Sequence, residues 1–260
     1  MNFPRVTVMI PNHNDEQYIQ KAIDSALNQD YLGPLRVCVV DDGSSDGSWD
    51  LINSLFENID SVERVQDLST IKGVRKNRSF IAIKRPQAGG PSEARNTGID
   101  FTLNDTDIYA MLDSDDEFYT KKVNTCVDIF VKDSGSVGVV YGDYDTYNTN
   151  TGIMIREFKE PFNRRRLVNE CIIHSGSVVS KEALVATKED TGYYDKNMRT
   201  CEDYDLWMRI SELFMIVHVA EALTMVRVTG ANSSFIIDSE TWQKNWKRVM
   251  EKFHQRNNAY

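Results

Sequence analysis

Five short apolar runs separated by amphipathic segments constrain the fold of residues 1–142 more than any other feature. Strands that are apolar throughout are typical of a sheet covered on both faces. Alternation with helical patterns at this spacing implies parallel strands joined by crossover helices. The sequence therefore predicts an α/β fold with a mostly parallel, Rossmann-like central sheet and helices on both faces. The runs are "RVTVMIP", "LRVCVV", "SFIAIKR", "IYAML" and "VGVVYGD".

The pattern changes after residue 142. Residues 144–158 resemble a hairpin with an Asn/Thr/Gly turn, and "CIIHSGSVVS" is strand-like. A short amphipathic helix is expected over 202–214, followed by strand over 215–228. The tail 238–255 has a helical stripe that we interpret as a packing face rather than a binding site. The stripe consists of Trp242, Trp246, Val249, Met250 and Phe253.

Composition excludes several classes of protein. The 260 residues are 41% hydrophobic and carry a net charge of −9, which argues against a broad nucleic-acid-binding face. The four cysteines form no CxxC pair, so we expect reduced, cytosolic thiols. No apolar stretch approaches the roughly 20 residues of a membrane span. We expect a cytoplasmic protein, soluble or peripherally membrane-associated.

Polar clusters follow four of the predicted strands. Because ligands bind beyond the carboxyl ends of parallel strands, these clusters are expected to share one crevice. Carboxylates alone would repel an anionic ligand, but carboxylates with a divalent cation would bind it, and their hard oxygens suit Mg²⁺ or Mn²⁺. The crevice should hold Asp15, Asp42, Arg95, Asp113 and Asp115.

The acidic stretch "DSDDE" ends the fourth run. Asp113 and Asp115 are two residues apart, so their side chains point the same way in an extended chain and could hold one metal that bridges a diphosphate. Asp116 and Glu117 are expected to support the turn and the next helix. Taken alone, the stretch is also compatible with a solvated, capped turn before a helix.

The order of the clusters carries more information than any one of them. "TVMIPNHND", "VVDDGSSDGS", "GGPSEARNTGI", "YAMLDSDDEF" and "CEDYDLWMRI" together resemble the large inverting glycosyltransferase family two, of the GT-A fold. The resemblance covers roughly residues 5–120 and 200–210. It implies that the protein transfers a sugar from a nucleotide-diphosphate donor to a hydroxyl acceptor with the help of Mn²⁺ or Mg²⁺. The donor would be a UDP-sugar, which is the commonest donor in the family.

The resemblance also assigns roles to matching residues. Asp203 would be the catalytic base, Asp113 and Asp115 would meet the metal, and Asp42 would accept a hydrogen bond from the uracil edge. Glu202, His174 and Trp207 fall on the acceptor side. The donor-binding set would be Pro11, Asn12, His13, Asp15, Asp42, Arg95, Asp113 and Ser114.

For three of these residues and the neighbouring Asp205, a structural role is an alternative to a functional one. A lone histidine beside a strand, such as His174, is more often structural. Trp207 could stack on a sugar, but its helical phase favours core packing. Glu202 would orient the base or cap the helix. Asp205 is expected to be solvated.

The chain departs from the family pattern in three places. Thr229 stands where many relatives carry a histidine that assists the metal, so metal binding would rest on the Asp113–Asp115 pair and water. Residue 13 is histidine rather than the commoner tyrosine. The polar stretch 60–78 is longer than usual and is expected to be an acceptor or partner loop.

We expect a single GT-A catalytic domain over 1–236 with a separate C-terminal helix. Its nucleotide-sugar half would be 1–118 and its acceptor-side half 119–236. The amphipathic helix 237–260 could dock on a membrane or a second subunit through Lys244, Lys247, Arg248 and Lys252. The acceptor would be a glycan, a lipid-linked saccharide or another hydroxyl compound.

Two other functions stay open at this level. Phosphatases of the haloacid-dehalogenase type also place a D-x-D after an apolar strand. In those enzymes the strand is normally the first one, and a Thr or Val follows the D-x-D. A catalytically silent carbohydrate- or partner-binding module could share the fold.

Overall fold

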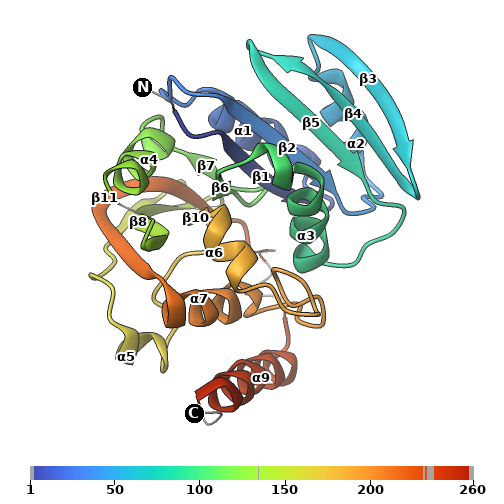
Figure 1. Ribbon diagram of the computed structural model, residues 1–260. Helices are drawn as coiled ribbons and strands as arrows, with labels where there is room; N and C mark the ends of the chain where they lie inside the picture. The colour runs from blue at the N-terminus through green and yellow to red at the C-terminus, as the bar shows by residue number, and fades with distance from the viewer. Residues whose placement is uncertain (1–2, 134, 231, 233–236, 258–260) are drawn as a thin grey trace.

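The computed structural model of the protein describes residues 3–133, 135–230, 232 and 237–257. Its strands join one 11-stranded sheet in the order β3-β4-β5-β2-β1-β6-β10-β8-β11-β7, with β9 paired to β8 (Figure 1). The strands are β1 (Val6–Asn12), β2 (Leu35–Asp41), β3 (Asn58–Val65), β4 (Leu68–Arg75), β5 (Arg78–Lys84), β6 (Ile108–Met111), β7 (Glu117–Phe118), β8 (Val137–Asn148), β9 (Met154–Glu157), β10 (Val178–Ser180) and β11 (Met215–Val228).

Helices connect these strands. They are α1 (Glu16–Leu27), α2 (Ser48–Ser54), α3 (Pro91–Thr102), α4 (Lys122–Lys132), α5 (Arg164–Leu167), α6 (Lys181–Ala186), α7 (Glu202–Leu213) and α9 (Ser239–Asn257), with a 3₁₀ turn over Leu103–Asp105.

The centre of the sheet is parallel, as predicted. Strands β5, β2, β1 and β6 run parallel, whereas β4 and β10 pair antiparallel with β5 and β6. The sheet is therefore mixed at both flanks. Because the central strands are parallel, the carboxyl ends of β1, β2 and β6 lie on one edge.

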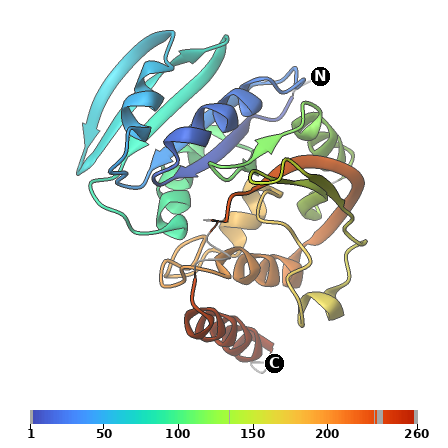
Figure 2. The same ribbon diagram turned by 180° about the vertical axis from the view of Figure 1, so that it is seen from behind.

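Successive residues of β1 enter two different cores. Val8 and Ile10 pack with α1, α2 and α4, whereas Met9 packs with α3 and α7. Helices α3 and α6 lie in front of the sheet in Figure 1, and α1 and α2 come forward in Figure 2. Gly98 permits the close approach of α3, because a Cβ there would lie 2.3 Å from Met9 Sδ.

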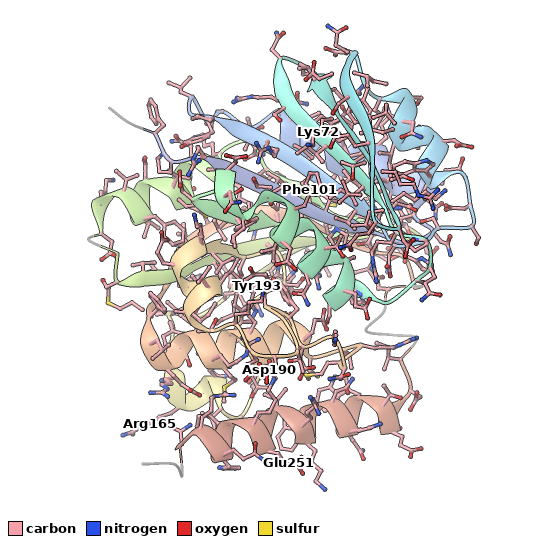
Figure 3. The ribbon with its side chains drawn as sticks, turned by 45° about the vertical axis from the view of Figure 1, so that its right-hand side comes forward. Lys72, Phe101, Arg165, Asp190, Tyr193 and Glu251 are labelled. Atoms are coloured by element: carbon pink, nitrogen blue, oxygen red, sulfur yellow. The ribbon has the colours of Figure 1, made fainter. Side chains whose placement is uncertain are left out.

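The polar stretch 60–78 is not a loop, so that expectation is wrong. It forms most of the β3–β4 hairpin and the start of β5, which extend the sheet edge with antiparallel strands. Lys72 Nζ on β4 lies 5.0 Å from the Phe101 ring centroid on α3 (Figure 3). Helix α2 ends at Ser54, and Ile59 belongs to β3.

The aromatic stripe of the tail packs only in part. Val249 is buried, and Met250 and Phe253 pack against the same core. Trp242 and Trp246 are 48% and 36% exposed, so the packing interpretation is wrong for these two. Figure 1 shows α9 beneath α7, at the end of the molecule away from β3.

Ion pairs attach α9 to the body of the protein. Lys252 Nζ lies 2.8 Å from Asp205 and 3.1 Å from Asp195, and Arg248 lies 2.9 Å from Asp195. Asp205 is fully buried, which corrects the expectation of a solvated residue. Arg248 and Lys252 are thus used internally rather than on a membrane-docking face.

A polar cavity of about 350 Å³ lies beside these pairs and includes Asp190 and Glu251 in its lining (Figure 3). Among the helices of the described residues, none has the length and apolar character needed to cross a membrane. All four cysteines are free.

Candidate active site

A cavity of about 750 Å³ opens at the carboxyl ends of the parallel strands. The loops after β1, β2 and β6 contribute to it, together with the start of α3 and α7. Every residue to which the sequence assigned a site role lines this cavity except Trp207. These lining residues are Pro11, Asn12, His13, Asp15, Asp42, Arg95, Asp113, Ser114, Asp115, His174, Glu202 and Asp203.

Arg95 connects two carboxylates in this cavity. Its Nη2 donates to Asp113 Oδ1 at 2.7 Å, and its Nη1 donates to Glu202 Oε1 at 2.8 Å. The guanidinium is buried on α3, so these charge-assisted hydrogen bonds are shielded from water. Arg95 therefore ties the turn after β6 to the start of α7.

Asp113 stays ionised in this environment. Burial would raise its pKa, but the Arg95 guanidinium and the Ser175 hydroxyl, which donates at 2.9 Å, outweigh burial and hold the pKa below its ordinary value. The carboxylate is therefore available to a cation.

Asp115 lacks a comparable cationic partner. Burial, Asp113 and Asp15 raise its pKa to about 7. The Asn232 amide donates to Asp115 Oδ2 at 2.8 Å and orients the carboxylate. Accumulated negative charge of this kind fits a bound divalent cation.

Asp116 has a structural role, as expected. It is buried and accepts the backbone N–H of Arg227 at 2.9 Å. The nearby Lys122 is a buried lysine that no sequence pattern marks, and it donates to Thr224 Oγ1 at 2.6 Å. Burial lowers the Lys122 pKa to about 8.

The carboxylates fit a magnesium- or manganese-type site with few protein ligands. No group of three or more His, Cys, Asp or Glu arranged to hold an ion occurs in the described ranges. Mg²⁺ is commonly held by one or two carboxylates together with substrate phosphates. Asp113 and Asp115 match that arrangement.

Asp203 is a half-buried carboxylate in the first turn of α7. Burial and the neighbouring Glu202 raise its pKa to about 7, which suits a general base at neutral pH. Its Oδ1 accepts the Tyr204 N–H at 2.7 Å. Cys201, immediately before α7, has a φ of 60°, a left-handed conformation that is unfavourable for a non-glycine residue. This strained residue directs the start of the helix into the cavity.

Asp42 directly follows β2 and lines the cavity from there. Its Oδ2 accepts the N–H groups of Gly89 and Gly90 at 2.9 and 2.7 Å, and Arg85 contacts its Oδ1. Asp42 therefore also shapes the loop that leads into α3. A hydrogen bond from the uracil edge to Asp42 would have to form in addition to these bonds.

Asn12 offers a second polar group beside Asp42. Its Nδ2 donates to Asp41 at 2.9 Å, and its Oδ1 has no partner among the described residues. The His13 ring lies 3.0 Å from the Asp42 carbonyl oxygen. A ligand N–H is a suitable partner for the free Asn12 oxygen.

The three acceptor-side candidates, His174, Glu202 and Trp207, differ in where their side chains lie. His174 lines the cavity, and burial lowers its pKa to about 3, so the ring is neutral. Trp207 is fully buried in the core, so it cannot stack on a sugar in this structure and that role is wrong. Glu202 accepts a hydrogen bond from Arg95 and directly precedes Asp203.

Three further cavity residues had no clear sequence signal. Asn232 lies three residues beyond Thr229, where the family pattern has histidine, and its Oδ1 accepts the Thr229 N–H at 2.8 Å. Tyr144 and Lys159 enter from β8 and from the segment after β9. Only chain folding brings these residues to the cavity.

The chain is similar to known proteins. The model of the family "Glycosyl transferase family 2" matches residues 7–186. Chondroitin synthase of Pasteurella multocida (strain Pm70) is 28% identical over 243 residues, covering 93% of this chain and 22% of that protein. Hyaluronan synthase of Pasteurella multocida is 28% identical over 232 residues, covering 89% of this chain and 21% of that protein. The chain thus spans about a fifth of these relatives.

Solved structures show the same fold. S. aureus TarS 1–349 in complex with UDP-GlcNAc has a TM-score of 0.69 at 15% identity, over 98% of this chain and 73% of that one. Mannosyltransferase PcManGT from Pyrobaculum calidifontis, in complex with GDP-Man and Mn²⁺, has a TM-score of 0.64 at 16% identity, over 99% and 65%. The expected GT-A fold is confirmed. Because the family match extends from β1 through α6, the chain belongs to glycosyl transferase family 2.

Proposed function

We propose that the protein transfers a sugar from a nucleoside diphosphate sugar, with UDP as the nucleotide, to a hydroxyl acceptor with inversion at the anomeric carbon. Mn²⁺ or Mg²⁺ would be bound. The observation that carries the proposal is the position of Arg95 between Asp113 and Glu202, next to Asp203. One rigid group thus links the proposed donor and base sides of the cavity.

Asp203 would take the proton from the acceptor hydroxyl as it attacks the sugar. With a pKa of about 7, the carboxylate is a stronger base than an ordinary aspartate, and about half of it is ionised at pH 7. Such a base contributes about 10²- to 10⁴-fold to a rate. A single displacement of this kind inverts the anomeric carbon and needs no enzymic nucleophile.

Asp113 and Asp115 would hold the metal. When bound, the ion would stabilise charge on the departing diphosphate. Arg95 and Asn232 fix the two carboxylates, and Lys122 offsets part of the negative charge beneath them.

The fold relatives support the choice of donor and ion. TarS has been solved with UDP and with UDP-GlcNAc, and PcManGT with GDP-Man and Mn²⁺. The acceptor would be a glycan, a lipid-linked saccharide or another hydroxyl compound.

The phosphatase alternative has no support in this arrangement. Asp113 and Asp115 follow β6, the fourth of the predicted apolar runs, rather than the first strand of the sheet. A silent binding module would bind a donor but never turn it over.

A thermal-shift panel tests the proposal. UDP-sugars with Mn²⁺ should stabilise the protein, by about 2.7 kcal/mol at 100 times Kd. GDP-sugars and metal-free samples serve as matched controls. If no nucleotide sugar shifts the melting temperature with or without metal, the proposed function is wrong.

A further inference from the structure

One wall of the candidate active-site cavity is a stack of His174, Tyr144 and Lys159. The His174 and Tyr144 ring centroids lie 4.7 Å apart at an interplanar angle of 30°, and Lys159 Nζ lies 5.4 Å from the Tyr144 centroid. His174 is close enough to Asp113 for each to influence the pKa of the other. The wall therefore leads from Asp113 to Lys159.

The four Lys and Arg side chains of the cavity lining fall into two pairs. Arg95 and Arg227 are both buried and held by carboxylates. Lys159 and Arg199 form no ion pair with any residue that the structure describes, although seven carboxylates line the same cavity. Their charges are therefore available to a ligand.

These two cations lie on the Asp203 side of the cavity. Arg199 precedes Asp203 by four residues, in the segment that leads into α7. The Cys171 thiol, which also lines the cavity, is within electrostatic reach of both Asp203 and Lys159. Asp113 and Asp115 line the same cavity from the turn after β6.

We propose that Lys159 and Arg199 bind an anionic group of the acceptor, next to the hydroxyl that Asp203 deprotonates. This inference rests on the proposed function. A protein of net charge −9 repels an anionic acceptor, so a local pair of cations is needed to bind one. The group would be the carboxylate of a uronic acid or a phosphate, since both accept charge-assisted hydrogen bonds from ammonium and guanidinium donors.

His174 would help to orient such an acceptor. Its Nδ1 accepts the Gly176 N–H at 3.0 Å, so in the neutral ring the proton is on Nε2. The ring can therefore donate to a sugar hydroxyl without adding charge.

A glycan array with matched pairs tests the inference. Protein loaded with UDP and Mn²⁺ is applied to glycans that differ at one sugar, as glucose, glucuronate or glucose 6-phosphate. Wild type should bind an anionic member at least tenfold better than its neutral partner. The uronate and phosphate arms show which anion is used.

Variants assign the preference to residues. Lys159→Gln and Arg199→Gln should each reduce the preference at least fivefold, Lys159→Arg should retain it, and Lys21→Gln, on the exposed face of α1, should not change it. Equal or better binding of neutral glycans, binding of no anionic glycan, or an unchanged preference in both Gln variants would overturn the inference.

The same samples separate this inference from the proposed function. Stabilisation by UDP and Mn²⁺ is measured first, by thermal shift. Donor binding without an anionic preference refutes only the acceptor inference, whereas absence of donor binding refutes the proposed function.

Discussion

The guanidinium of Arg95 lies 2.7 Å from Asp113, and its other nitrogen reaches Glu202, the residue before Asp203. A lysine cannot make both contacts with the same planar fork. Arg95→Lys should therefore lower kcat at least tenfold while the protein stays folded. Steady-state kinetics and a melting curve check this. A native kcat in a folded Arg95→Lys variant would show that the bridge is dispensable.

The pKa of Asp203 predicts the acidic limb of the pH profile. Burial and Glu202 raise this pKa to about 7, and only the ionised form accepts a proton. Activity should fall about tenfold per pH unit below pH 7 and level off above it. Glu202→Gln removes a neighbouring negative charge and should move the limb to lower pH. An unchanged limb in this variant would contradict the assignment.

Metal binding should depend on Asp115 and its hydrogen-bond partner. Asp115→Asn should abolish the Mn²⁺-dependent part of UDP stabilisation. Asn232→Ala, which frees the Asp115 carboxylate, should weaken Mn²⁺ binding about 10- to 100-fold. Calorimetric titration of Mn²⁺ in the presence of UDP measures both effects. Asn150→Ala, in the exposed turn after β8, is the matched control. Unchanged Mn²⁺ binding in both site variants would contradict the proposed ligands.

The ion pairs beneath α9 should stabilise the fold. Lys252→Met leaves Asp205 and Asp195 buried with less positive charge around them and should cost about 3 kcal/mol. Lys247→Met removes only an exposed pair with Glu251 and should cost less than about 1 kcal/mol. Denaturant unfolding measures both. Equal losses would show that the buried network contributes no more than a surface pair.

The parallel centre of the fold was predictable because its physical signal is local. A strand such as β1 is apolar at every position, since Val8 and Met9 face two different cores. The clusters at the strand ends followed from topology, which places the carboxyl ends of parallel strands on one edge.

Other features depend on partners that are distant along the chain. Asp205 pairs with Arg209 on its own helix, but it looked solvated because its second cation, Lys252, lies 47 positions away on α9. Asn232 reaches Asp115 across 117 positions, and no local pattern marks it. The β3–β4 hairpin was missed because β3 is almost entirely exposed and has no apolar periodicity.

The most direct test of the account is sugar transfer by Asp203→Asn, measured together with donor binding. Asn keeps the size of the side chain but cannot take up a proton. The account predicts that product formation falls at least 100-fold while UDP-sugar and Mn²⁺ stabilise the variant as they do wild type. Transfer by Asp203→Asn at the native rate would contradict it.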